Sequence, residues 1–218
     1  EDVLARRSRA LFLNAKAAAD TNALFSGCTG FEDPNCGITR SGASGSFSYS
    51  VNTGFANKPV NRVSFYDSLR FTNWLNNGQG GADTETGAYT ITLTGITNNT
   101  ITRNALANTF LPSENEWYKA AYYDAVSTSY FDYPTGTDTP TTCSEPTATA
   151  NSANCFNTAN PEPPGAGRVT DVGAYTGSAS PYGTYDQGGN VFEWNEQIAG
   201  GSRRGIRGGG IAAPAGYL

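Results

Sequence analysis

Apolar residues recur at helical spacing in the stretch SFYDSLRFTNWLNNG, which spans residues 64–78. The residues that share one face of such a helix are Phe65, Leu69, Phe71, Trp74 and Leu75. Ser64 is a good N-cap, with Asp67 at the third helical position, and Asn77-Gly78 supplies a stop. The pattern therefore predicts a helix between Ser64 and Asn77.

Two further helices are expected. The segment FLPSENEWYKAAYYD, residues 110–124, contains an S-x-x-E capping box made by Ser113 and Glu116, followed by inward-facing Trp117, Ala120 and Ala121. The Ala-rich segment 3–19 has apolar residues at helical spacing, namely Val3, Leu4, Ala10, Leu11 and Leu13. Arginines lie between them, which leaves a membrane- or calmodulin-targeting helix as the alternative to a packed first helix.

Alternation of apolar and polar residues marks the expected strands. SGSFSYSVNTG, residues 44–54, predicts a short strand or hairpin arm. TGAYTITLTGITNNTITR, residues 86–103, predicts a hairpin that turns at Asn98-Asn99. Residues 125–170 lack periodicity, and an irregular segment of that length needs a disulfide, a bound ion or a ligand-binding role to explain it.

Composition narrows the functional classes. Glycine (26) and proline (11) are abundant, charged residues make up only 15%, and the net charge is −5 without a basic run. Nucleic acid and anionic membranes are therefore not expected partners, and no apolar run is long enough to span a membrane. The chain has no histidine, which excludes Ser-His-Asp and Cys-His nucleophiles and histidine-ligated metals. It also has no methionine, so we expect a processed product or a fragment.

The four cysteines, Cys28, Cys36, Cys143 and Cys155, form no C-x-x-C motif. They fall into two local pairs within loop-like sequence, which favours the disulfides Cys28–Cys36 and Cys143–Cys155 over buried reduced thiols. Disulfides indicate an extracellular or cell-surface location.

Four segments in order resemble the formylglycine-generating enzyme, or sulfatase-modifying factor, family: NKPVNRVSFYDSLRFTNWL (57–75), FLPSENEWYKAAYYD (110–124), SPYGTYDQGGNVFEWNE (180–196) and RGIRGGG (204–210). The G-N-V-F-E-W element is the most specific. The resemblance implies a single α+β domain over residues 1–218 with the C-type-lectin-like fold, rich in loops, with two main helices and short antiparallel strands. It also implies that the family continues beyond Leu218, so that the chain lacks its C-terminal end.

The resemblance implies an enzymatic activity only if the catalytic residues of the family are present in this chain. Members of the family that generate formylglycine hold copper with two cysteines after the R-G-G-S element. Here Ile211–Leu218 contain no cysteine, and Gly210 replaces the serine. Related sulfoxide synthases need iron-binding histidines, which are absent. We therefore expect no copper site and no catalytic residues.

The resemblance also implies structural Ca²⁺ at the G-N-V-F-E-W element. The positions that match its ligands are Asp186, Gly189, Val191 and Glu193, with backbone carbonyls contributed by the glycine and the valine. A second site matches residues 151–171, with Asn154 and the Cys155 carbonyl as candidates. The alternative is that Glu193 and Asn190 only pin the loop through backbone hydrogen bonds.

Several arginines, tryptophans and tyrosines could either stabilise the fold or bind a ligand. Arg204 and Arg207 are expected to pair with Glu193 or Glu196, or else to bind an anion. Three tryptophans are expected in the core, with a sugar-stacking role as the alternative; these are Trp74, Trp117 and Trp194. The tyrosines most suited to face a ligand are Tyr122, Tyr123, Tyr130 and Tyr133.

The sequence thus predicts a non-catalytic, calcium-stabilised extracellular binding or surface-display domain, whose partner is an unidentified protein or glycan. One alternative is a copper-dependent formylglycine-generating oxidase with its cysteines beyond Leu218. The other is a structural subunit of a filament or surface layer that assembles with itself.

Overall fold

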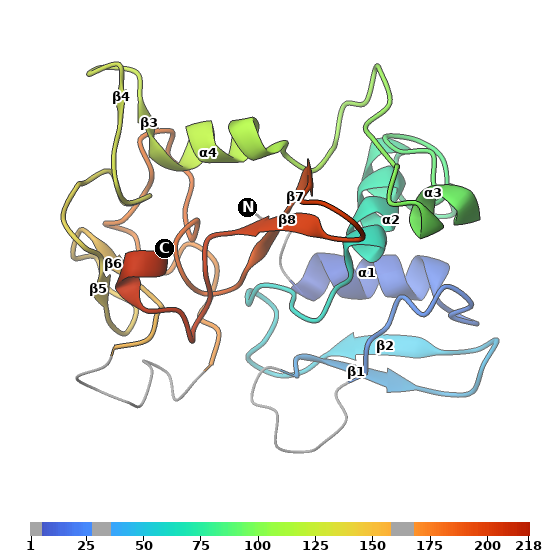
Figure 1. Cartoon of the computed structure of the whole chain (residues 1–218). Coiled ribbons are helices and arrows are strands. Elements are labelled where there is room, and N and C mark those ends of the chain that lie inside the picture. The colour runs from blue at the N-terminus through green and yellow to red at the C-terminus, as the bar shows by residue number, and fades with distance from the viewer. Residues whose placement is uncertain (1–5, 28–35, 158–167) are drawn as a thin grey trace. The chain divides into compact units, whose positions relative to one another are not determined.

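The elements of the fold are short and separated by long loops. The computed structural model describes residues 6–27, 36–157 and 168–218. Its helices are α1 (Arg6–Lys16), α2 (Phe65–Asn76), α3 (Leu93–Thr97), α4 (Glu114–Tyr122) and the 3-10 helix η2 (Ala215–Tyr217). Its strands are β1 (Ile38–Ser41), β2 (Ser48–Val51), β3 (Tyr123–Asp124), β4 (Ser129–Tyr130), β5 (Thr142–Cys143), β6 (Ser152–Ala153), β7 (Glu193–Ile198) and β8 (Arg204–Arg207). The predicted loop-rich α+β class is confirmed (Figure 1).

Among the described residues, each strand belongs to a two-stranded sheet. The β1–β2 and β3–β4 pairs are antiparallel, as expected, whereas β5 and β6 pair in parallel. In the part of the chain that the structure describes, no helix combines the length and apolar character needed to cross a membrane.

The chain divides into two compact units. The N-terminal unit comprises Asp2–Pro112 and Glu196–Gly205, and the C-terminal unit comprises Ser113–Asn195 and Ile206–Leu218. Strands β7 and β8 pair with each other, and the boundary between the units passes through both. The candidate calcium ligands all belong to the C-terminal unit.

The N-terminal unit has an aromatic core. The buried residues that form it are Phe12, Leu13, Ala17, Leu24, Tyr49 and Trp74. Phe12 packs edge-on against Phe71 and Trp74, with ring centroids 5.3 and 5.4 Å apart. The Asn14 side chain joins α1 to β2, because its amide donates to the Tyr49 carbonyl at 2.7 Å and its oxygen accepts the Tyr49 N–H at 2.9 Å. This core confirms the packed first helix.

The composition of the buried face of α1 differs from the prediction. Leu11 is exposed, whereas Arg6 and Arg9 are buried together with Phe12 and Leu13. The Arg9 guanidinium donates to the Leu24 carbonyl at 2.6 Å, and it lies over the Phe12 ring. Arginine can occupy such a position because its long stem packs against apolar atoms while its guanidinium finds carbonyl acceptors.

The helices with clear capping signals form where the sequence predicts them. Ser64 caps α2 by accepting the Asp67 N–H, and Asn77 is the C-cap. Ser113 and Glu116 form the complete capping box of α4. The caps pair donors that the first turn of a helix leaves without partners, so they fix where each helix starts.

The hairpin predicted for residues 86–103 is wrong. The segment contains the short helix α3, and of the predicted ladder only the isolated bridge between Tyr89 and Arg103 forms. Thr92 caps α3 by accepting the Gly95 N–H at 3.0 Å, and Gly95 approaches Ile101 so closely that a Cβ there would lie 2.8 Å from its side chain. The local cap and this close approach therefore override the alternating pattern.

Candidate calcium site

A sharp turn carries the predicted calcium ligands in the C-terminal unit. Asp186, Gly189 and Asn190 all have φ angles in the left-handed region, at 59°, 88° and 60°. At Gly189 a Cβ would lie 2.5 Å from the backbone oxygen of Asn154, so only glycine fits. The Asn190 N–H donates to that same oxygen at 2.8 Å. The turn therefore brings Asn154 next to Gly189, although 35 positions separate them in the sequence.

Asn154 is buried and incompletely paired. Its side-chain amide donates to the Arg168 carbonyl at 2.9 Å and to Asn190 Oδ1 at 3.3 Å. Its own Oδ1 is buried without a hydrogen-bond partner in the described structure. A buried acceptor left without a donor costs about 1–3 kcal/mol. A bound cation or a water molecule would remove that cost.

Glu193 is the second unusual group. Its carboxylate accepts a hydrogen bond from Trp117 Nε1 at 2.6 Å. The residue as a whole is only partly buried, but its carboxylate lies deep among protein atoms. This burial, together with the negative charge of Asp186, raises the pKa of Glu193 to about 7, although the hydrogen bond from Trp117 lowers it. Asp186 is anchored separately, because its carboxylate accepts the Gly173 N–H at 2.7 Å.

A bound divalent cation would relieve the repulsion between the carboxylates of Asp186 and Glu193. Ca²⁺ prefers carboxylate, amide and backbone carbonyl oxygens. Among the described residues, no group of three or more His, Cys, Asp or Glu side chains converges on one point. A site here would therefore need backbone and amide oxygens beside Asp186 and Glu193. The structure brings the predicted ligands together as two pairs: the backbone oxygen of Asn154 meets Gly189, and the charge of Asp186 acts on Glu193. Val191 is partly buried and lies between Gly189 and Glu193 in the sequence.

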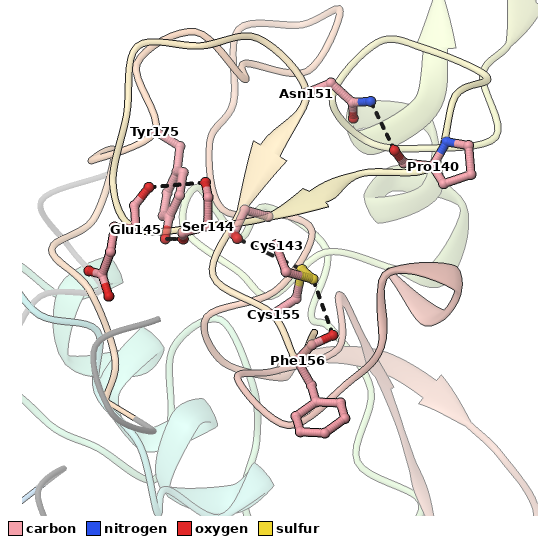
Figure 2. The surroundings of a disulfide bond; sticks show 9 residues. Pro140, Cys143, Ser144, Glu145, Asn151, Cys155, Phe156 and Tyr175 are labelled. Carbon is pink, nitrogen blue, oxygen red and sulfur yellow. Dashed lines mark hydrogen bonds between the residues drawn. A yellow bond between two sulfur atoms is a disulfide. The ribbon is translucent and has the colours of Figure 1, made fainter. Parts of the chain in front are cut away.

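A disulfide fixes the segment next to Asn154. Cys143 and Cys155, the pair that the sequence favours, are bonded with their Cα atoms 4.9 Å apart, and Cys155 is fully buried. The bond joins Cys143, the last residue of β5, to Cys155, which lies two residues after the end of β6 (Figure 2). Cys36 is also disulfide-bonded, whereas Cys28 lies outside the described residues. Since Asn154 directly precedes Cys155, the disulfide restricts where its side chain can lie.

Hydrogen bonds secure the irregular segment around this disulfide. Figure 2 shows the Asn151 amide donating to the Pro140 carbonyl, at 3.1 Å. It also shows the Tyr175 hydroxyl donating to the Ser144 carbonyl, at 2.7 Å. In the described part of residues 125–170, the regular secondary structure consists of the two-residue strands β4, β5 and β6, which accounts for the missing periodicity.

Neither Arg204 nor Arg207 forms the predicted ion pair with the side chain of Glu193 or Glu196 among the described contacts, although Arg204 does donate to the backbone carbonyl of Glu196 at 3.2 Å. Arg207 pairs with Glu114 at the start of α4, not with Glu193 or Glu196. The Arg204 guanidinium donates to Asn99 Oδ1 at 2.5 Å and to the Ile101 carbonyl at 2.9 Å. The carboxylate of Glu196 instead binds the guanidinium of Arg103, with the shortest N···O distance at 2.7 Å. These choices depend on which elements pack together, and the spacing of residues in the sequence cannot show that.

Trp117 has a role at the site that the sequence pattern does not predict. Trp117 is buried in the core, as predicted, and so is Trp74, while Trp194 is only half-buried. The donation from the Trp117 indole to Glu193 was not foreseen. A buried indole N–H needs an acceptor, so the prediction that Trp117 is buried already implies that some acceptor lies beside it, without saying which one.

Three of the four tyrosines expected to face a ligand lie together. Tyr130 packs against Tyr123 with ring centroids 5.0 Å apart, and Tyr122 joins them through Tyr118. Tyr133 lies instead in a tight turn, where its N–H donates to the Thr137 carbonyl at 3.1 Å.

Comparison with known proteins identifies the fold and the family of this chain. A search of curated protein sequences gives no match. Among solved structures, one titled "Crystal Structure of CarF" is similar to this chain with a TM-score of 0.58 and 21% identity, covering 96% of this chain and 73% of that one. At that identity the likeness shows a shared fold. A family model described as "Sulfatase-modifying factor enzyme 1-like domain" matches residues 25–216. The match confirms the resemblance seen in the sequence motifs, and the chain belongs to the sulfatase-modifying factor enzyme 1-like family.

Proposed function

We propose that this chain is a non-catalytic extracellular binding or surface-display domain that Ca²⁺ stabilises. The observation that carries the proposal is the oxidised state of its described cysteines. Cys36, Cys143 and Cys155 are all in disulfides, and copper-dependent formylglycine generation needs cysteine thiolates as ligands. Disulfides also persist outside the reducing cytoplasm, which supports the extracellular location.

The calcium part of the proposal rests on the geometry of the C-terminal unit. Asp186 and Glu193 would supply carboxylates, and the turn at Gly189 would supply backbone carbonyls together with Val191. Asn154 Oδ1, which is buried and lacks a donor in the described structure, would supply an amide oxygen at the adjoining position. Bound Ca²⁺ would offset the repulsion between the carboxylates and hold the loops of this unit together.

Isothermal titration of the chelator-treated protein with CaCl₂ tests the metal. We expect saturable binding with a Kd of about 0.1–1 mM, the range of extracellular modules. Glu193→Gln should weaken binding about tenfold or more, because it removes one ligand charge. Asp132→Asn changes an exposed carboxylate of the same unit and serves as the matched control. Equal binding by wild type and Glu193→Gln would remove calcium from the proposal.

Oxygen consumption tests the non-catalytic part. The protein is incubated with copper, a reductant and a cysteine-containing peptide, and the peptide thiol is followed in parallel. We expect no oxygen uptake above the rate of copper without protein. Uptake matched by loss of peptide thiol would show an oxidase and leave the calcium result unaffected.

A further inference from the structure

One Asn-x-Ser/Thr triplet occurs in the sequence, Asn98-Asn99-Thr100. Such a triplet, with any residue but proline in the middle, is the acceptor for N-linked glycosylation of secreted proteins. It lies in the N-terminal unit, at the end of α3, where Asn98 is the C-cap and its backbone N–H donates to the Thr94 carbonyl at 2.9 Å. The three side chains of the triplet differ in what the fold requires of them.

The middle residue is required by the fold. Asn99 is 4% exposed, and its φ of 54° lies in the left-handed region, which asparagine tolerates. Its side-chain amide donates to the carbonyls of Gly201 and Arg203 at 3.0 and 3.2 Å, and its Oδ1 accepts from the Arg204 guanidinium at 2.5 Å. The turn after α3, and the contact of that turn with the chain between β7 and β8, therefore account for Asn99.

The fold does not use the side chains of Asn98 and Thr100. Both residues are exposed, and within the described residues neither the Asn98 amide nor the Thr100 hydroxyl forms a hydrogen bond. The φ of Asn98 is −90°, so the left-handed conformation that favours asparagine at helix ends is not the reason for it. Thr100 is held by its backbone, whose N–H donates to the Gly95 carbonyl at 3.0 Å. Capping and turn formation therefore leave unexplained the two side chains that define the triplet.

The surface around the triplet can accept a large group. Thr94 and Thr97 of α3 are exposed, and Leu93 at its start is 80% exposed. An N-linked oligosaccharide is bulky and needs a surface position. Because the fold is anchored through Asn99 and not through its two neighbours, a sugar on Asn98 displaces no hydrogen bond of the protein.

We propose that Asn98 is a site of N-linked glycosylation; this rests on the extracellular location in the proposed function and adds a covalent modification to it. The donor is an oligosaccharide linked to a lipid diphosphate. The bond between the anomeric carbon of its first sugar and the diphosphate oxygen breaks, and a bond from that carbon to Asn98 Nδ2 forms. The lipid diphosphate leaves, and the amide nitrogen gives up one proton. The Thr100 hydroxyl identifies the acceptor to the transferase.

Translation of the full chain behind a secretion signal, in the presence of endoplasmic-reticulum microsomes, tests this. Protection from added protease shows that the chain has entered the vesicles, and peptide N-glycosidase followed by mass spectrometry detects the glycan. We expect one glycan per chain, whose removal leaves a carboxylate at position 98. Asn98→Gln and Thr100→Ala should abolish it, and Thr100→Ser should retain it. Asn115→Gln changes an exposed asparagine outside the triplet and is the matched control, which should keep the glycan.

The outcomes separate this inference from the proposed function. A protected wild-type chain without a glycan, or a glycan that persists in Asn98→Gln, would overturn the inference, while the binding role and the calcium site would stand. A protected chain that fails to form the Cys143–Cys155 disulfide would count against the extracellular location instead.

A second measurement tests whether the site is free in the folded protein. The glycosylated chain should bind Ca²⁺ as tightly as the same chain after glycosidase treatment, because Asn98 belongs to the N-terminal unit and its side chain holds no contact of the fold. Weaker binding by the glycosylated chain would show that the sugar disturbs the fold, and would contradict the inference.

Discussion

The interactions that stabilise the interior of the N-terminal unit differ from those inside the C-terminal unit. The N-terminal unit has a core of buried aromatic and aliphatic residues around Phe12 and Trp74. In the C-terminal unit, an apolar cluster of Ala153, Cys155 and Leu218 lies at the Cys143–Cys155 disulfide, and Cys36 of the N-terminal unit is disulfide-bonded as well. Within the described residues, the buried side-chain oxygens without a hydrogen-bond partner all belong to the C-terminal unit: those of Thr141, Asn154 and Thr170.

Buried polar groups make the contrast clearer. In the N-terminal unit, Asn73 is fully buried, and its side chain bonds both the N–H and the carbonyl of Tyr89, at 2.8 and 3.0 Å. In the C-terminal unit, Asn154 is equally buried, yet its Oδ1 lacks a donor. The same residue type is thus fully paired with protein in one unit, whereas in the other one of its acceptors has no donor among the described residues. The proposed calcium site rests on this difference.

The largest effect is expected in the aromatic core. Trp74→Ala should lower the free energy of unfolding by about 4 kcal/mol, because it leaves a cavity beside Phe12 and Phe71. Denaturant unfolding measures the loss, and Leu106→Ala, at a 97% exposed side chain, is the control that should change little. The calcium affinity of the folded Trp74→Ala variant should equal that of wild type. A weaker affinity would mean that the units do not depend on separate interactions.

Removal of the Cys143–Cys155 disulfide should have the next largest effect. Closing a loop across 12 positions stabilises by about 3 kcal/mol in the chain-entropy model. The double substitution Cys143→Ala with Cys155→Ala should therefore lose that amount, and it should also weaken calcium binding, because Asn154 loses its anchor. Titration calorimetry and denaturant unfolding measure the two effects. An unchanged calcium affinity would show that calcium binding does not depend on the disulfide.

The raised pKa of Glu193 predicts an unusual dependence of the protein's stability on pH. Its pKa is raised from an ordinary 4.5 to about 7 in the folded protein, so between these values the folded state binds more protons than the unfolded state. The metal-free protein should therefore lose about 2–3 kcal/mol of stability as pH rises from 4.5 to 7. Thermal unfolding in chelator measures this.

Two comparisons isolate that effect. Glu193→Gln should lack this part of the pH dependence, and saturating Ca²⁺ should abolish it in wild type by binding the ionised carboxylate. If wild type and Glu193→Gln follow the same pH profile in chelator, the carboxyl is not the group responsible.

The helix caps should show the smallest effects and no difference between the units. Ser64→Ala and Ser113→Ala each remove a side-chain acceptor from a helix N-terminus, which costs about 1 kcal/mol. Denaturant unfolding of the two variants provides the measurement. If Ser113→Ala lowered the free energy of unfolding several times more than Ser64→Ala, the Ser113 cap would stabilise the calcium site as well as the N-terminus of α4.

Local signals explain what the sequence could predict. The starts of α2 and α4 depend on residues within one turn, Ser64 with Asp67 and Ser113 with Glu116, and both helices form where these occur. Residues 86–103 show the limit of such signals. Their alternating pattern favours strands, but packing of Gly95 against Ile101 stabilises α3.

The candidate site could be predicted only in part. The motif G-N-V-F-E-W located Glu193 and the glycine turn, because both lie in one short segment. The meeting of Asn154 with Gly189 depends on a backbone approach between distant segments, which no local pattern encodes. The partners of Arg204 and Arg207 were missed for the same reason, since Asn99 and Glu114 lie about a hundred positions away.

Hydrogen exchange measured by mass spectrometry, in chelator and in saturating Ca²⁺, tests most directly whether the two units are stabilised differently. We predict that Ca²⁺ slows exchange in peptides from residues 168–195, which include the turn at Gly189, and leaves peptides from residues 64–90 unchanged. Equal slowing in both sets of peptides, or no change in either, would contradict the account.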